Sequence, residues 1–219
     1  MNRMFMLLFA LAVTAGAQSK LVFTEEFQVY GLFSMPTGDF ASTTADRAGF
    51  ALPGFGIGAD VMMVSDKNVA IVGSVNYSRN SRDGEAILKE GGFPAGATIE
   101  DRSFSTTYLL AGARVNIPVT ETVRPFVMAQ GGILFASYPG LNISDNVISI
   151  VASSSSSSAM AFSLSAGARV FSSFDLSVRY FRSEPEFKSE ASVTMINGTF
   201  VWEGKMPISA LMVVVGYAF

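Results

Sequence analysis

The last eight residues of the chain constrain its fold most strongly. They read Met-Val-Val-Val-Gly-Tyr-Ala-Phe and end at Phe219, with large apolar side chains at every second position. Side chains of a β-strand point alternately to the two sides of the sheet, so Val213, Val215, Tyr217 and Phe219 share one face. Such an apolar face suits a barrel strand in contact with lipid, where aromatic residues mark the membrane boundary. The pattern therefore predicts a transmembrane β-strand.

The first residues of the chain have the pattern of a secretory signal peptide. Arg3 supplies a positive charge, residues 5–15 are almost entirely apolar, and Ala-Gly-Ala at 15–17 matches a small-residue cleavage site. The apolar stretch is shorter than the ~20 residues that a transmembrane helix needs. We therefore expect residues 1–17 to be removed as a signal peptide and residues 18–219 to form the mature domain.

The rest of the chain contains eight segments in which apolar residues recur with the two-residue period of a strand. The connections after the second, fourth and sixth segments are short, whereas those after the first, third, fifth and seventh are long and polar. This alternation is expected of a barrel with short periplasmic turns and long extracellular loops. We therefore predict an all-β, eight-stranded, antiparallel, up-and-down transmembrane barrel with strands at Phe27–Met35, Gly54–Val64, Val69–Ser78, Phe104–Ile117, Val123–Ala136, Met160–Phe171, Phe174–Arg182 and Ile208–Phe219.

The composition excludes several classes of function. The chain has no Cys and no His, which excludes disulfides, imidazole metal ligands and Ser-His or Cys-His catalytic pairs. It has 15 basic and 18 acidic residues, so its bulk charge does not favour nucleic acid as a partner. The serine run at 153–158 has no base beside it and is interpreted as a solvated loop or a polar extension of a strand. We expect a non-enzymatic protein with no cofactor and no metal.

The sequence Ala-Gly-Ala-Arg-Val occurs twice, at 111–115 and 166–170, each time just before a short connection. An arginine that faced lipid at the midplane would cost ~2–4 kcal/mol, so both arginines are predicted to point into the lumen. Gly112 and Gly167 share this inward phase and are expected to make room for the arginine side chains. The same phase directs six charged residues into the lumen: Asp60, Arg114, Arg124, Arg169, Asp175 and Arg179.

Two interpretations of these lumen charges stay open. Charges in a narrow space are costly unless they are paired, which favours a network of ion pairs that plugs the barrel. The excess of arginine favours instead a narrow anion-selective path.

The neighbouring carboxylates Glu25 and Glu26 lie beside the predicted membrane boundary and are interpreted as a solvated face.

The last long connection has the strongest signal for a surface hairpin. Asn197-Gly198 lies between alternating β-formers, and this dipeptide favours a two-residue turn. A turn at this dipeptide would place Val178 opposite Tyr217 in the barrel. The hairpin is predicted to project as a ribbon whose exposed side chains contact an extracellular partner, neighbouring loops or lipopolysaccharide. These contact residues are Met195, Phe200 and Trp202.

Three segments carry a resemblance to a known family. The terminal Val-Gly-Tyr-Ala-Phe resembles the signal that the barrel assembly machinery of the outer membrane reads, with Val215, Tyr217 and Phe219 as its apolar positions. Together with Tyr30–Phe40 and Val123–Val127, it makes the chain similar to the small outer-membrane β-barrel domain family that includes the OmpX and OmpA-barrel types. The resemblance implies a location in the bacterial outer membrane, in contact with its lipid, lipopolysaccharide and assembly machinery.

The resemblance specifies architecture better than activity. It implies a role in adhesion, host interaction or envelope integrity, exerted by extracellular loops on a protein or matrix ligand. A small channel for ions or small solutes is the first alternative. The second is a soluble periplasmic lipocalin-like barrel, which the apolar outer face of the terminal strand disfavours.

Removing the terminal aromatic residue tests the predicted assembly signal. Because Phe219 and Tyr217 share the face presented to lipid, deleting Phe219 or replacing it with Asp is expected to leave the protein in the periplasm, where proteases degrade it. Membrane fractionation combined with gel mobility before and after heating measures the yield of assembled barrel. Wild-type yield from the deleted variant would contradict the assignment.

Overall fold

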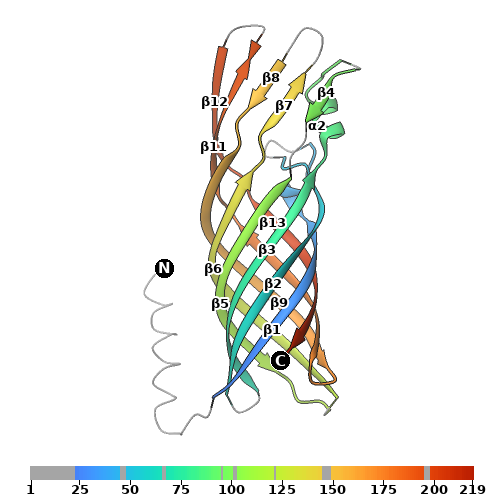
Figure 1. The fold of residues 1–219 in the computed structure, drawn as a ribbon, viewed down its shortest axis with the longest axis vertical. Helices are drawn as coiled ribbons and strands as arrows, with labels where there is room; N and C mark the ends of the chain where they lie inside the picture. Colours follow the sequence, from blue (N-terminus) through green and yellow to red (C-terminus); the bar gives the residue numbers. More distant parts are fainter. Residues whose placement is uncertain are drawn as a thin grey trace.

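The protein is a closed β-barrel that continues at one end into a smaller second sheet (Figure 1). The computed structural model describes residues 23–44, 48–65, 68–94, 96–100, 103–120, 122–144, 149–194 and 198–219. The predicted signal peptide lies outside the described residues. The prediction of an all-β, eight-stranded antiparallel barrel is confirmed.

The barrel strands follow one another in the order β1-β13-β10-β9-β6-β5-β3-β2, and β2 pairs with β1 to close the ring. The strands agree with the predicted segments, and most of them extend further toward the long connections, whereas β5 and β13 do not and β1 extends mainly at its N-terminal end. The serine run contributes to such an extension, because β9 begins five residues before the predicted start at Met160. The strands are β1 Phe23–Pro36, β2 Ala51–Ser65, β3 Val69–Arg82, β5 Phe104–Asn116, β6 Val123–Tyr138, β9 Ser155–Val170, β10 Phe174–Ser183 and β13 Ile208–Ala218.

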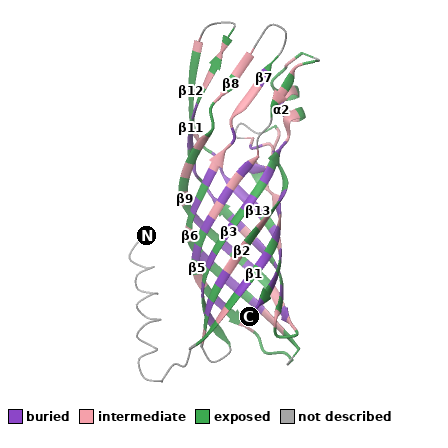
Figure 2. Ribbon diagram, viewed as in Figure 1, coloured by how far each residue is buried: buried purple, intermediate pink, exposed green. Residues whose placement is uncertain are grey.

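Buried and exposed residues alternate along the barrel strands (Figure 2), as expected when successive side chains face the lumen and the outside in turn. In β3 the alternation of exposed and buried residues is unbroken over the whole strand. Ile71 and Val75 point outward and are exposed, whereas Ser74 and Asn76 point inward and are buried. An apolar outer face around an interior that carries many polar side chains is the arrangement expected of a barrel dissolved in lipid.

Aromatic rings mark both edges of the outer apolar belt. Near the short turns, Phe219 packs against Phe27 and Tyr217, with ring centroids 6.3 and 5.0 Å away. Toward the long connections, Phe33 packs against Phe55 at 5.1 Å. Two aromatic edges with an apolar band between them define the lipid-facing part of the barrel.

Beyond the barrel, the third, fifth and seventh connections form a five-stranded sheet in the order β12-β11-β8-β7-β4 (Figure 1). The last connection is therefore not the predicted isolated ribbon, because its strand β11 pairs with β8 of the fifth connection, and β4 of the third connection belongs to the same sheet. A short helix, α2 at Gly84–Glu90, begins where the Asp83 carboxylate accepts a hydrogen bond from the Ala86 amide at 3.0 Å. The strands of the sheet are β4 Thr98–Glu100, β7 Leu141–Ser144, β8 Ser149–Ala152, β11 Glu186–Val193 and β12 Gly198–Lys205.

None of the helices in the described part of the chain is long and apolar enough to cross a membrane.

The predicted turn at Asn197-Gly198 is wrong. Gly198 pairs with Val193, so the chain reverses between these two residues, and in the barrel Tyr217 lies opposite Phe174 rather than Val178. The pairing of β11 with β12 continues the register of β10 with β13 without a shift. The long run of strand pairing, and not the dipeptide, therefore sets the register of the hairpin. The shift is an even number of residues, and therefore every side chain keeps its predicted face.

The inward glycines allow neighbouring strands to pack closely. The expected reason for them, room for the arginine side chains, is different. A Cβ on Gly112 would lie 2.0 Å from the Ala129 carbonyl oxygen, and one on Gly167 would lie 2.4 Å from the Leu176 carbonyl oxygen. Both oxygens belong to the backbone of an adjacent strand rather than to an arginine side chain. A side chain at either position would therefore push two barrel strands apart.

Replacing Gly112 with Ala tests this packing. The added methyl group forces β5 away from β6, so we expect the free energy of unfolding to fall by ~1–3 kcal/mol. Urea unfolding of the refolded barrel in detergent measures it. Gly73→Ala is the matched control, because a Cβ at this outward glycine of β3 meets nothing within 4 Å. Equal midpoints for the two variants would contradict the account.

Candidate functional site

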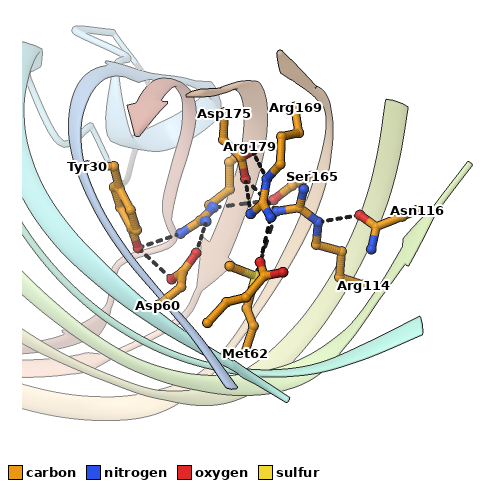
Figure 3. Close-up of polar contacts among 10 residues, drawn as sticks. Tyr30, Asp60, Met62, Arg114, Asn116, Ser165, Arg169, Asp175 and Arg179 are labelled. Carbon is orange, nitrogen blue, oxygen red and sulfur yellow. Dashed lines mark hydrogen bonds and ion pairs between the residues drawn. The ribbon is translucent and has the colours of Figure 1, made fainter. Parts of the chain in front are cut away.

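The lower part of the lumen contains a cluster of ion pairs built on Asp175 of β10 (Figure 3). Its carboxylate accepts hydrogen bonds from Arg114 Nη1 at 2.5 Å and from Arg169 Nε at 2.7 Å. Arg169 Nη1 also donates to Glu26 Oε2 of β1 at 2.5 Å. Arg114 donates through Nε to Asn116 at 2.8 Å. Four barrel strands are thereby tied together through side chains inside the lumen.

A second cluster lies around Arg179 of β10 (Figure 3). Its Nη2 is 3.6 Å from Asp60 Oδ2, and its Nη1 donates to Tyr30 Oη and Asn76 Oδ1, both at 3.1 Å. The Tyr30 hydroxyl donates to Asp60 Oδ1 at 3.0 Å. The Tyr30 ring occupies the space next to Gly58, where a Cβ would lie within 2.5 Å of it. Burial of these groups excludes water, so each charge depends on its protein partner.

The sixth predicted lumen residue, Arg124, lies in the inward phase of β6 but at its periplasmic end, where it is half-buried. It stands opposite Arg169 in the strand register and forms no ion pair within the described residues. Glu26 was missed, because its position beside the boundary suggested a solvated face. The two-residue period of β1 indicates its inward position, because Glu26 lies two and four residues before the buried, inward-facing Gln28 and Tyr30.

The upper lumen contains a cluster of buried apolar side chains, with hydrogen-bonded polar side chains such as Ser78 and Thr106 beside it. Leu134, Phe181 and Tyr108 are almost fully buried, and the rings of Tyr108 and Phe181 lie 4.0 Å apart. These residues belong to a continuous buried cluster that extends from the middle of the barrel to its extracellular mouth. The arrangement suits a packed interior, with ion pairs below and an apolar core above.

The extracellular mouth is covered by aromatic rings centred on Tyr138. Its ring packs against Phe104 at 5.4 Å, Phe187 at 5.5 Å and Trp202 at 6.2 Å, and its hydroxyl accepts a hydrogen bond from Arg82 Nη2 at 2.8 Å. Trp202, one of the predicted contact residues, thus covers the mouth with one side of its ring and remains 47% exposed. Phe200 is 55% exposed on the same strand, and Met195 lies outside the described residues.

Comparison with known proteins identifies the family. Residues 5–219 match the family described as outer membrane protein beta-barrel domain, and the chain belongs to this family. It is therefore an outer-membrane β-barrel protein located in the bacterial outer membrane, as predicted, and the lipocalin-like alternative is wrong. No curated protein matches the chain.

Solved structures of outer-membrane proteins are similar to the chain. A major outer membrane protein of Thermus thermophilus is 9% identical, with a TM-score of 0.53 over 90% of this chain and 100% of that one. The attachment invasion locus protein of Yersinia pestis, in complex with the heparin analogue sucrose octasulfate, is 14% identical, with a TM-score of 0.48 over 90% and 99%. The outer membrane protease OmpT of Escherichia coli is 10% identical, with a TM-score of 0.49 over 91% and 98%. At these identities the likeness concerns the fold alone.

Replacing Asp175 with Asn tests the importance of the lower ion pairs. The change leaves two buried arginines without their shared carboxylate, so we expect the free energy of unfolding to fall by ~3–5 kcal/mol. Urea unfolding in detergent measures it. Glu203→Gln is the matched control, because its pair with Lys188 is exposed and 3.7 Å long. If both variants unfold at the wild-type midpoint, the network does not stabilise the barrel.

Proposed function

We propose that this protein is a non-enzymatic outer-membrane barrel that binds an extracellular protein or matrix ligand through its extracellular sheet. The observation that carries the proposal is the position of β12 at the edge of that sheet. Among the described strands, β12 pairs only with β11, so its other edge is open. An open edge presents unpaired backbone donors and acceptors to which an extended segment of a partner can add.

The side chains of β12 support this assignment. Phe200, Val201 and Trp202 are 55%, 57% and 47% exposed, so apolar surface lies on both faces of the strand. Proteins usually protect an open edge with proline or with charged side chains, and residues 198–202 contain neither. Glu203 forms an ion pair with Lys188 of the neighbouring strand β11, so its charge does not protect the apolar residues 200–202 from a partner strand. Backbone pairing would provide affinity, and the three side chains would select the partner.

The lumen supports a structural role more than a channel. The three arginines of the two ion-pair clusters are matched by Asp60, Asp175 and Glu26, and buried apolar and hydrogen-bonded polar side chains pack the lumen above them. A path for ions would require these packed groups to separate. We therefore propose that the lumen charges lock the strands together and hold the extracellular sheet on a rigid base.

The ends of the chain are proposed to serve export and assembly. Residues 1–17 would direct the chain across the inner membrane as a signal peptide. Val215, Tyr217 and Phe219 would then be read by the barrel assembly machinery. This proposal is supported by the outward position of all three side chains and by the ring contact between Tyr217 and Phe219 at 5.0 Å.

The binding proposal is tested by replacing Phe200 and Trp202 together with Ser. Apolar anchors of an interface typically contribute ~2 kcal/mol or more each, so we expect binding to drop at least tenfold. The measurement is adhesion of cells that display the protein to surfaces coated with basement-membrane matrix or with host cells. Val151→Ser on β8 is the matched control, because it removes an equally exposed apolar side chain away from the open edge.

Heat-modifiable gel mobility must show that each variant is folded. A Cys introduced at Glu203 is expected to react with a membrane-impermeant maleimide on intact cells, whereas one at Asn68, in the turn after β2, should react only after lysis. The reverse labelling pattern would invert the barrel and end the proposal. Unchanged adhesion of the folded double variant would instead show that β12 is not the binding edge.

A further inference from the structure

A shallow groove of about 390 Å³ lies on the outer face of the barrel, across β5, β6 and β9. Its outward-facing side chains form two rows, in which the strand register places neighbouring residues opposite one another. The upper row is Ser105, Ser137 and Ser156, and the lower row is Thr107, Phe135 and Ser158. The groove therefore presents five hydroxyl groups around one exposed aromatic ring.

These hydroxyl groups are available to a ligand. Ser156 and Ser158 are exposed, and the other three hydroxyl residues are half-buried. Within the described part of the chain, none of the five side chains forms a hydrogen bond. In contrast, Ser78 and Thr106 on the inner face bond to each other at 2.7 Å.

The groove lies at the extracellular boundary of the lipid-facing belt. The next outward residues along the same strands toward the periplasm are Leu109, Ile133 and Met160, and all three are exposed and apolar. In the other direction lies the sheet formed by the long connections, which outer-membrane barrels place outside the cell. The hydroxyl rows are thus at the depth of the lipid headgroups in the outer leaflet and continue the lipid contact surface.

A cationic side chain borders the groove. Arg79 of β3 stands directly opposite Ser105, points outward and is exposed. It forms no ion pair among the described residues, whereas Arg182 and Lys188, also exposed, are paired with Glu184 and Glu203. The lining of the groove contains no carboxylate. Among the described residues, the site therefore combines neutral hydroxyls with the positive charge of Arg79 at one end.

We propose that this groove binds the phosphorylated sugar headgroup of a glycolipid in the outer leaflet. The serine and threonine hydroxyls would exchange hydrogen bonds with the sugar hydroxyls and amides, and the Phe135 ring would pack against a C–H face of the sugar. Arg79 would bind the phosphate, for which a guanidinium is well suited. A phospholipid could satisfy the arginine but offers few groups to the hydroxyl rows. The proposal does not depend on β12 or on binding of an extracellular partner.

Native mass spectrometry of the refolded full barrel in detergent tests the site, with three lipids as probes: bisphosphorylated lipid A, dephosphorylated lipid A and phosphatidylglycerol. The wild type is expected to bind lipid A at least tenfold more tightly than phosphatidylglycerol. Replacing Ser105, Ser137 and Ser156 together with Ala should weaken binding of both lipid A forms at least tenfold, because several hydrogen bonds are lost. Arg79→Gln should weaken only the phosphorylated form.

The matched control replaces three hydroxyl residues near the periplasmic rim with Ala, namely Thr24, Thr122 and Ser173, and should bind as the wild type does. Heat-modifiable mobility shows that each variant is folded. Equal binding of phosphatidylglycerol and lipid A by the wild type, or unchanged lipid A binding by the folded triple serine variant, would overturn the proposal. Loss of all lipids in the Arg79 variant would show charge attraction without sugar recognition and would overturn it as well.

Discussion

The absence of hydrogen-bonding solvent within a bilayer is the constraint on which the rest of this structure depends. Each backbone N–H and C=O in the lipid layer needs a partner from the chain itself, and pairing of β1 with β2 removes the last open edges. Closure also fixes the two environments of each strand. Outward side chains meet lipid and are apolar, while inward side chains such as Asn76 and Arg114 are removed from both lipid and bulk water.

The closed ring makes the lumen a small, enclosed space, and this explains its chemistry. Charged residues are tolerated there because opposite charges from different strands meet, as Asp175 does with Arg114 and Arg169. Such pairs are costly to break, so they resist relative sliding of the strands that carry them. Toward the mouth, apolar packing of residues such as Leu134 and Phe181 takes over. The result is a rigid support for the extracellular sheet.

Above the membrane the constraint is relaxed, and the strands leave the ring to form an open sheet. The outer edge of its strand β12 can remain unpaired because water solvates the free backbone groups there. The boundary between the lipid-facing barrel and the extracellular part is sharp. From one outward position to the next, the side chains change from apolar Leu109 and Met160 to polar Thr107 and Ser158. The proposed contacts with a partner and with glycolipid both belong to this outer part, where the sequence is free to be polar.

The sequence by itself determined the barrel, because a two-residue period needs no tertiary information to separate lipid-facing from lumen-facing side chains. It also predicted the phase of Asp60, Arg114, Arg169 and the other inward charges. It did not determine which charges meet, since the partners lie on strands distant in the chain. The role of Glu26 and the half-buried place of Arg124 at the rim required the closed ring.

The register of the last hairpin shows the same division. Asn197-Gly198 has a local preference for a tight turn, yet the ladder that begins at Phe174 and Tyr217 extends to Val193 and places the reversal earlier. Many backbone hydrogen bonds along two long strands outweigh one turn preference. Pairing of β11 with β8 likewise joins two loops into a sheet that no local pattern indicated. Periodicity is a local property and can be read from the sequence, whereas register and loop pairing are decided only when distant segments meet.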